Sequence, residues 1–188
     1  ADWASVGGFI HGTTLATNAL IERRGAMVAT VTTEGFRDIL EIAYERRYSQ
    51  YDINLVKLDL IVPRKRAFTI GGRMDAGGQE LHPLDEEGVA HLVEQIKASG
   101  AEAVAICLLH AYANPAHELR LHDLLHTALP DLVISLSHEV SPEAREFDRL
   151  STTIANAYML RTTHADVAGW RRLTVVNNAF HMPRTRRP

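Results

Sequence analysis

Cysteine is nearly absent from this chain, with Cys107 the single example among its 188 residues. One cysteine excludes an internal disulfide and a zinc site made of cysteines. The chain also lacks a long hydrophobic run: the strongest, 103–109, is far shorter than the roughly 20 apolar residues that cross a membrane. Neither an Asn-x-Ser/Thr sequon nor a basic, apolar leader behind Ala1 marks a secreted protein. These absences predict a soluble, cytoplasmic domain.

Common nucleotide-binding and hydrolase motifs are missing too, namely the P-loop, the dinucleotide glycine fingerprint and the Gly-x-Ser-x-Gly elbow. The histidines supply no clear metal motif in their place. His117 and His122 stand about 500° apart along a helix, so they do not share a face as zinc-protease histidines do. His122 and His126 have the i, i+4 spacing of two metal ligands, but exposed histidines on a solvated helix are the favoured interpretation. We therefore predict no metal site.

Apolar residues make up 46% and charged residues 23% of the chain, which is typical of a soluble globular domain. The charge is unevenly distributed, because 161–188 carry a net charge of +5 whereas 1–160 carry −8. Clustered arginines bind nucleic acid by releasing phosphate counterions. A solvated or ill-ordered terminus is the favoured alternative, because no nucleic-acid motif accompanies these arginines.

Apolar runs that alternate with amphipathic stretches predict a series of strands and helices. The expected strands are 7–11, 27–32, 66–74, 103–109 and 132–136. The expected helices are 13–23, 36–43, 85–99, 114–129 and 142–158, with a hairpin turn at 75–79 and a loop-rich connection at 44–63. Thr33 is a candidate N-cap, and Gly25 and Gly100 are expected to be left-handed C-caps. Because 103–109 is typical of a strand buried on both faces, we predict an α/β fold, a parallel or mixed sheet with packed helices.

One junction has the features of a binding site. The first expected strand ends at His11, Gly12 lets the backbone turn closely, and Thr13 and Thr14 stand where the next helix begins. Such a junction presents backbone N–H groups and the positive end of the helix dipole to a phosphate or carboxylate. The alternative, that Thr13 is only an N-cap and His11 an edge residue, remains open.

The same segment carries a family resemblance. His-Gly-Thr-Thr-Leu-Ala-Thr-Asn-Ala-Leu-Ile-Glu-Arg-Arg-Gly-Ala, at 11–26, resembles the opening signature of the hydantoinase/oxoprolinase A family of ATP-dependent ring-opening hydrolases. Further collinear motifs extend the resemblance over about residues 5–160. They lie at 31–42, 51–52, 60–64, 83–87, 102–118, 137–143 and 151–158.

The resemblance implies part of one lobe of an actin-like ATPase (ribonuclease-H-like) fold. It further implies ATP and Mg²⁺ as cofactors and a small cyclic amide, such as a hydantoin or 5-oxoproline, as substrate. ATP would phosphorylate the lactam or imide oxygen. Related ketone carboxylase subunits belong to the same family. The resemblance therefore leaves open which ring compound is the substrate and whether the chain belongs to the hydrolase or the carboxylase branch. The residues that it places at the cleft are His11, Gly12, Thr13, Thr14 and Asn18. Weaker candidates are Arg37, Glu41, Glu139 and Ser141, for which a charge pair or a helix cap is the alternative. The catalytic residues are left unassigned.

Two departures from the family pattern shape the expected organisation. Family chains begin with a glycine- and threonine-rich phosphate hairpin, whereas this sequence starts after it. They also continue past the Asn-Ala-Tyr motif into a second lobe, whereas the resemblance here stops at Met159. We therefore expect a domain over 1–160 that lacks the leading phosphate hairpin, and a divergent basic tail over 161–188.

These features predict a fragment or subunit lobe of an ATP-dependent cyclic amide hydrolase that requires a second lobe or partner subunit. The alternative is a non-catalytic, truncated relative that only associates with such a partner. We also expect self-association through an exposed inter-lobe face, and nucleic acid is the less favoured partner.

Overall fold

The computed structural model describes residues 15–44, 51 and 59–166, and the expected strand 7–11 and most of the basic tail lie outside them. In the described part, a four-stranded sheet forms the centre of the molecule, in the order β2-β1-β5-β6. All of its strand pairs are parallel. The strands are β1 (Val28–Thr33), β2 (Ala67–Ile70), β5 (Ala103–Cys107) and β6 (Val133–Leu136). This confirms the α/β class, and of the two expected sheet types, parallel or mixed, the central sheet is the parallel one.

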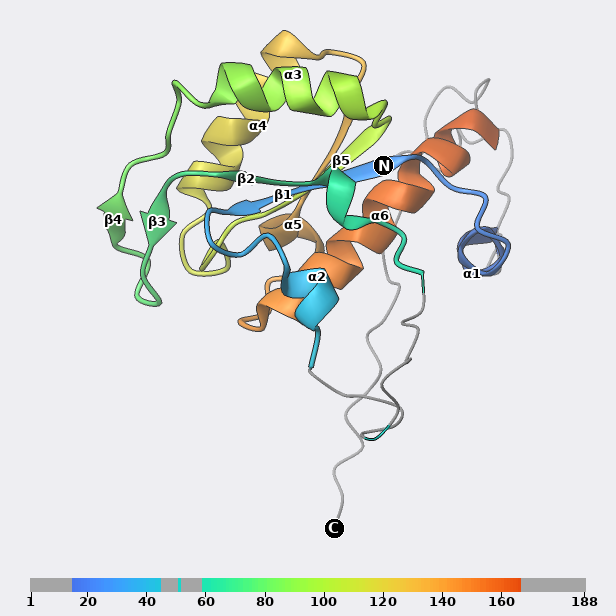
Figure 1. Ribbon diagram of the computed structural model, residues 1–188, viewed down its shortest axis with the longest axis horizontal. Coiled ribbons are helices and arrows are strands. Elements are labelled where there is room, and N and C mark those ends of the chain that lie inside the picture. Colours follow the sequence, from blue (N-terminus) through green and yellow to red (C-terminus); the bar gives the residue numbers. More distant parts are fainter. Residues whose placement is uncertain (1–14, 45–50, 52–58, 167–188) are drawn as a thin grey trace, which may run out of the picture.

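Helices cover both faces of the sheet (Figure 1). Helices α3 (Val89–Ser99) and α4 (Ala116–Ala128) lie on one face, and the long α6 (Glu146–Asp166) lies on the other. The shorter helical segments are α1 (Leu15–Ile21), α2 (Ile39–Ile42), α5 (Ser137–Val140) and the 3-10 turn η2 (Arg64–Arg66). No helix in the described ranges is both long and apolar enough to cross a membrane.

The central strand β5 supplies a core to each face, because alternate side chains of a strand point to opposite sides. Val104 and Ile106 pack with α3 and α4, whereas Ala103, Ala105 and Cys107 pack with α6. All five are buried, as the apolar run predicts. The side chains toward α6 are the smaller ones, so this helix can lie close to the sheet.

The expected strand 66–74 is wrong as one unit, because it breaks at Gly71 and Gly72. Gly72 has a φ of 129°, and a Cβ there would meet Leu84 Cα at 3.0 Å. After this break, β3 (Arg73–Met74) pairs antiparallel with β4 (Glu80–His82) in a separate ribbon. The expected turn between them is confirmed: Asp75 Oδ1 accepts hydrogen bonds from the backbone N–H groups of Gly77 and Gln79.

Several expected helices differ from the structure in extent. The region 36–43 is helical only in α2, and Thr33 does not cap it, because its hydroxyl oxygen accepts a hydrogen bond from Leu109 N–H instead. Helix α3 begins at Val89, four residues after Asp85, whose carboxylate caps the preceding turn at Gly88 N–H. The expected helix 142–158 is present as α6, which begins later, at Glu146, and continues to Asp166, and the short α5 before it was not expected.

The two glycine caps have different outcomes. Gly100 ends α3 in the left-handed conformation, with a φ of 68°, as predicted. The predicted cap at Gly25 is wrong, since Gly25 is not among the glycines with positive φ. Its lack of a side chain is needed for another reason: a Cβ there would lie 2.1 Å from the Tyr158 ring. Beside it, Ala26 N–H donates to the Tyr158 carbonyl and ties β1 to α6.

Candidate functional site

The carboxyl ends of β1, β5 and β6 meet at one edge of the sheet, where open α/β folds bind their ligands. At this edge, which we call the carboxyl edge, Thr33 ends β1, Leu108 follows β5 and Ser137 follows β6. Thr33 Oγ1 accepts a hydrogen bond of 2.9 Å from Leu109 N–H, which fixes β1 to the segment after β5. Polar groups from three parallel strands are thereby brought together.

Glu118 of α4 is the centre of a buried hydrogen-bond network at this edge. Its side chain is fully buried. Oε1 accepts from Leu108 N–H at 2.9 Å and from the Ser137 hydroxyl at 2.6 Å. Oε2 accepts from the backbone N–H of His138 at 3.1 Å and lies 2.7 Å from its Nδ1. One carboxylate therefore joins the ends of β5 and β6.

Arg149 of α6 supplies the opposite charge and is also fully buried. Its Nε donates to Ser137 Oγ at 3.1 Å, and its Nη2 donates to the Leu108 carbonyl at 3.1 Å. The guanidinium also lies 5.5 Å from the centre of the Tyr112 ring, in a cation–π contact. The Ser137 hydroxyl bridges the two charges: it donates to Glu118 and accepts from Arg149. Each buried charge is therefore hydrogen-bonded, and only the Ser137 side chain separates the two.

His138 connects this network to the surface, since 16% of its side chain is exposed. A carboxylate only accepts hydrogen bonds, so Nδ1 of His138 carries the proton in the contact with Glu118. The hydrogen bond to Glu118 raises the pKa of His138, and the nearby negative charges of Glu118 and Glu139 add to it against the opposing effect of burial. The structure thus holds an imidazole in one orientation and stabilises its protonated form.

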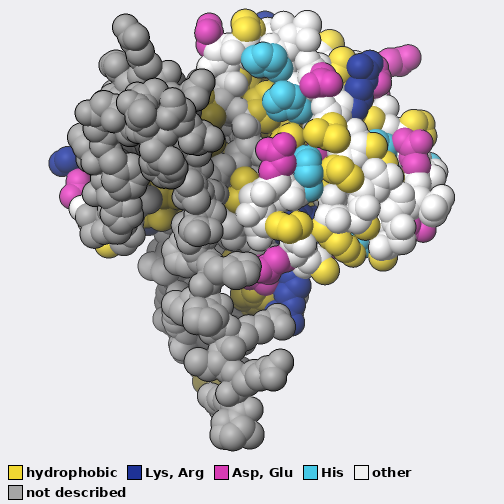
Figure 2. All heavy atoms as spheres, turned by 180° about the vertical axis from the view of Figure 1, so that it is seen from behind, with side chains coloured by type: hydrophobic (Ala, Val, Ile, Leu, Met, Phe, Trp, Pro, Cys, Tyr) yellow, Lys and Arg dark blue, Asp and Glu magenta, His cyan; other side chains and the backbone are white. Residues whose placement is uncertain are grey.

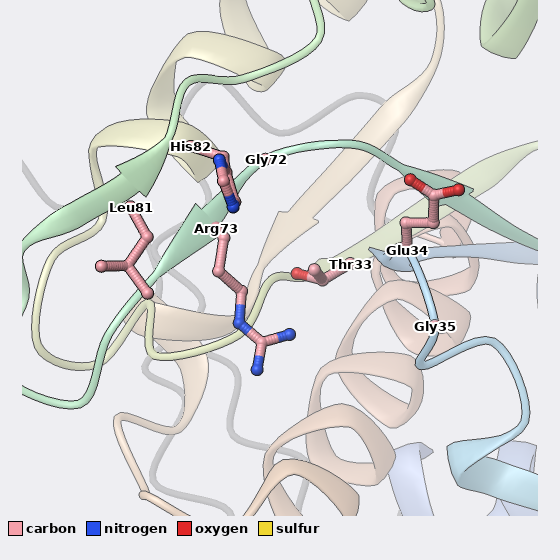
Figure 3. A pocket seen from close by; sticks show the side chains of 7 residues that line it. All are labelled: Thr33, Glu34, Gly35, Gly72, Arg73, Leu81 and His82. Atoms are coloured by element: carbon pink, nitrogen blue, oxygen red, sulfur yellow. The ribbon is translucent and has the colours of Figure 1, made fainter.

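A pocket of about 620 Å³ opens between the end of β1 and the ribbon of β3 and β4. It is lined by Thr33, Glu34, Gly35, Gly72, Arg73, Leu81 and His82. Figure 3 shows the Arg73 side chain extending between Leu81 and Thr33. Its guanidinium lies 5.3 Å from the centre of the Phe36 ring. The volume falls in the range of small-molecule sites, about 300–1,000 Å³.

The sequence-predicted site residues are not gathered at this pocket. His11, Gly12, Thr13 and Thr14 lie outside the described residues. Asn18 is exposed on α1, which packs on α6 and lies far from β3 and β4 (Figure 1).

The weaker candidates lie on other elements. Arg37 donates to the carbonyls of Ala67 and Arg64, a contact that holds the start of β2, and Glu41 is half-buried in α2. Glu139 is exposed on α5, and Ser141 is the residue that ends this helix.

The buried network was missed by the sequence reasoning, although one signal was available. Glu118 has i, i+3 and i+7 spacing with Leu121 and Leu125, the buried apolar stripe of α4. A carboxylate on an apolar stripe indicates a buried and partnered charge. Arg149 lies among buried neighbours as well, because it adjoins Leu150 and precedes the polar Thr153 by one turn.

The residues of the described ranges do not form a cluster of three or more His, Cys, Asp or Glu side chains able to hold a metal ion. His122 and His126 stack on α4 with ring centres 5.8 Å apart, but they are only two ligands. On the face drawn in Figure 2, histidine, charged and hydrophobic side chains are intermingled. Arg73 is the one Lys or Arg among the described residues that line the pocket. This part of the chain alone therefore does not fit a complete ATP and Mg²⁺ site.

Comparison with known proteins identifies the family. A family model described as the hydantoinase/oxoprolinase N-terminal region matches residues 2–129. The chain belongs to this family. It is 39% identical over 152 residues to caprolactamase subunit alpha of Pseudomonas jessenii, a match that covers 80% of this chain and 22% of that protein. It is 29% identical over 177 residues to the acetophenone carboxylase gamma subunit of Aromatoleum aromaticum, covering 87% of this chain and 24% of that protein.

The fold agrees with the family. The crystal structure of ATP-dependent caprolactamase from Pseudomonas jessenii matches with a TM-score of 0.77 and 37% identity, over 85% of this chain and 23% of that chain. The predicted architecture is confirmed: the chain is α/β, with a sheet and packed helices as in the lobes of actin-like ATPases. The chain spans about a quarter or less of the length of these relatives.

Proposed function

We propose that this chain forms part of one lobe of an ATP-dependent enzyme that hydrolyses a small cyclic amide. The likeness to caprolactamase, in both sequence and fold, carries this proposal. Relatives in the family include a carboxylase subunit as well. We favour the hydrolase branch because the caprolactamase match has the higher identity.

The carboxyl edge of the sheet supports this proposal as the face that contributes to the reaction. The pocket at this edge is large enough for a small ring compound, and Arg73 places a positive charge on its wall. A cationic side chain at a pocket favours a developing oxyanion or a phosphoryl group. The Glu118–Arg149 network holds the adjoining strand ends in place.

Binding of ATP and Mg²⁺ would require protein groups beyond those that line the pocket. We propose that His11, Gly12, Thr13 and Thr14, with Asn18, contribute backbone and hydroxyl groups, and that a second lobe or partner subunit supplies the rest. Residues 1–160 would belong to the lobe and 161–188 would be the tail, with α6 crossing this boundary to end at Asp166. When the partner is absent, we expect the exposed inter-lobe face to drive self-association, which light scattering would reveal. A sharp monomer peak at working concentration would contradict this part.

A chimera tests the proposed function. In caprolactamase subunit alpha of Pseudomonas jessenii, this chain would replace the segment that it matches, and ATP-dependent caprolactamase activity would be measured in the reconstituted enzyme. We expect activity above that of the enzyme lacking the segment. For this chain alone, we expect no ATP turnover above a buffer blank with hydantoin or 5-oxoproline. A folded but inactive chimera would favour the alternative, a non-catalytic relative that only associates with its partner.

A further inference from the structure

The carboxyl edge carries one imidazole whose two nitrogens have different surroundings. Nδ1 of His138 lies 2.7 Å from the buried carboxylate of Glu118. Nε2 has no hydrogen-bond partner among the described residues, and the side chain reaches the surface. A carboxylate that binds Nδ1–H fixes the tautomer, so that Nε2 keeps a lone pair directed away from the carboxylate.

A purely structural role accounts for most of the Glu118 network but not for this contact. The bonds from Leu108 N–H, the Ser137 hydroxyl and His138 N–H already join the strand ends. The fourth hydrogen bond, between His138 Nδ1 and Glu118 Oε2, adds no link between elements, because the His138 backbone N–H already binds the same carboxylate. What the fourth bond does is orient a titratable ring.

The charges near His138 favour proton uptake by this ring. The negative charges are Glu118 of α4 and Glu139 of α5. Arg149 of α6, on the far side of the Ser137 hydroxyl, carries a positive charge and acts in the opposite sense. The hydrogen bond and the negative charge of Glu118 raise the pKa of His138 above its usual value. The raised pKa makes the neutral imidazole a stronger acceptor for a proton.

We propose that His138 is a proton-transfer residue of this carboxyl edge and that Glu118 is its positioning residue. This inference rests on the proposed function. Neutral His138 would take a proton from a water molecule or hydroxyl group onto Nε2, while Nδ1–H stays hydrogen-bonded to Glu118. The imidazolium formed is stabilised by that carboxylate and later returns its proton to the leaving group or to solvent.

His138→Asn separates this role from a structural one. An asparagine amide places an N–H donor where Nδ1 lies, so it keeps the contact with Glu118, but it has no group that exchanges a proton. In the caprolactamase chimera, we expect H138N to fold normally and to lose about 100- to 10,000-fold in turnover. We also expect partial rescue by added imidazole and loss of the acidic limb of the pH–rate profile. His126→Asn, the same change at an exposed histidine on α4, should leave turnover unchanged.

A purely structural His138 gives the opposite result. H138N would then retain the wild-type rate and pH profile, and this would overturn the proposal. His138→Gln, whose amide reaches toward the Nε2 position without proton exchange, is the second variant and should be equally inactive. A wild-type rate in H138Q would also overturn the proposal.

A second measurement does not depend on catalysis. In the chain labelled with ¹⁵N-histidine, we expect neutral His138 to carry its proton on Nδ1 and to titrate above the value of a free histidine. A proton on Nε2, or titration at or below the free value, would overturn the placement. An inactive wild-type chimera combined with the expected titration would count against the proposed function and leave the Glu118–His138 geometry supported.

Discussion

Replacing Glu118 with Gln tests whether the buried network holds the carboxyl edge together. A carboxylate accepts hydrogen bonds through both oxygens, whereas an amide accepts through one end and donates through the other. In Glu118→Gln the amide NH₂ must therefore face either Leu108 N–H or His138 N–H, since these contacts lie on different oxygens. One backbone N–H group is then left buried without an acceptor.

The expected loss of stability follows from these contacts. A buried donor without an acceptor costs about 1–3 kcal/mol. Arg149, which is fully buried, also loses its counter-charge, and removing one partner of a buried pair costs about 3–5 kcal/mol when the charges touch. Here the Ser137 hydroxyl separates the two charges, so the second cost is smaller. We expect E118Q to lower the free energy of unfolding by about 3–5 kcal/mol in total.

Urea denaturation of the 188-residue chain, followed by far-UV circular dichroism, measures this loss. Glu86→Gln is the matched control, because Glu86 forms an exposed ion pair with Arg120 at 2.7 Å. Exposed pairs contribute about 0–1 kcal/mol, so E86Q should unfold close to the wild type. If E118Q and E86Q unfolded at the same urea concentration, the inference that the buried charges hold this edge would be refuted.

Three further changes have defined outcomes. Gly72→Ala should lower the free energy of unfolding by about 1–3 kcal/mol, because a φ of 129° is strained for any residue with a side chain. The control Gly77→Ala should change this free energy little, and equal urea midpoints for the two variants would contradict the prediction. Cys107 should resist thiol reagents in the folded chain at mildly alkaline pH, because burial raises its pKa to about 11, and rapid labelling without denaturant would show that the strand is accessible. The contribution of His138 to stability should be full below about pH 6.5 and be lost as the pH rises through its raised folded pKa. Urea unfolding of the wild type and of H138N at several pH values measures this contribution. A contribution that grows as the pH rises would contradict the prediction.

The regular core was predictable from the sequence because its signals are local. The β-branched run of β1 and the apolar run of β5 indicate buried strands wherever the rest of the chain lies. Gly100 was recognisable for the same reason, since a helix that ends in the left-handed conformation favours glycine.

The remaining features depend on distant partners and were therefore beyond local patterns. The requirement at Gly25 comes from the ring of Tyr158, and the role of Thr33 comes from Leu109 N–H. The site network has the same origin, because Glu118 and Arg149 meet only through Ser137. Family resemblance indicated the lobe but not these contacts.

Helix α6 has a mechanical consequence for the lobe. Near its start, Arg149 donates hydrogen bonds to Leu108, which follows β5, and to Ser137, which follows β6. Nine residues later, about 14 Å along the axis, its Tyr158 carbonyl receives the N–H of Ala26 and its ring fills the space above Gly25. The helix thus works as a stiff strut between the two edges of the sheet. A ligand that shifts Arg149 at the carboxyl edge would therefore also move Gly25 and Ala26, where the chain enters β1. Helix α1, which carries Asn18, would then move in response to binding at the opposite edge of the sheet.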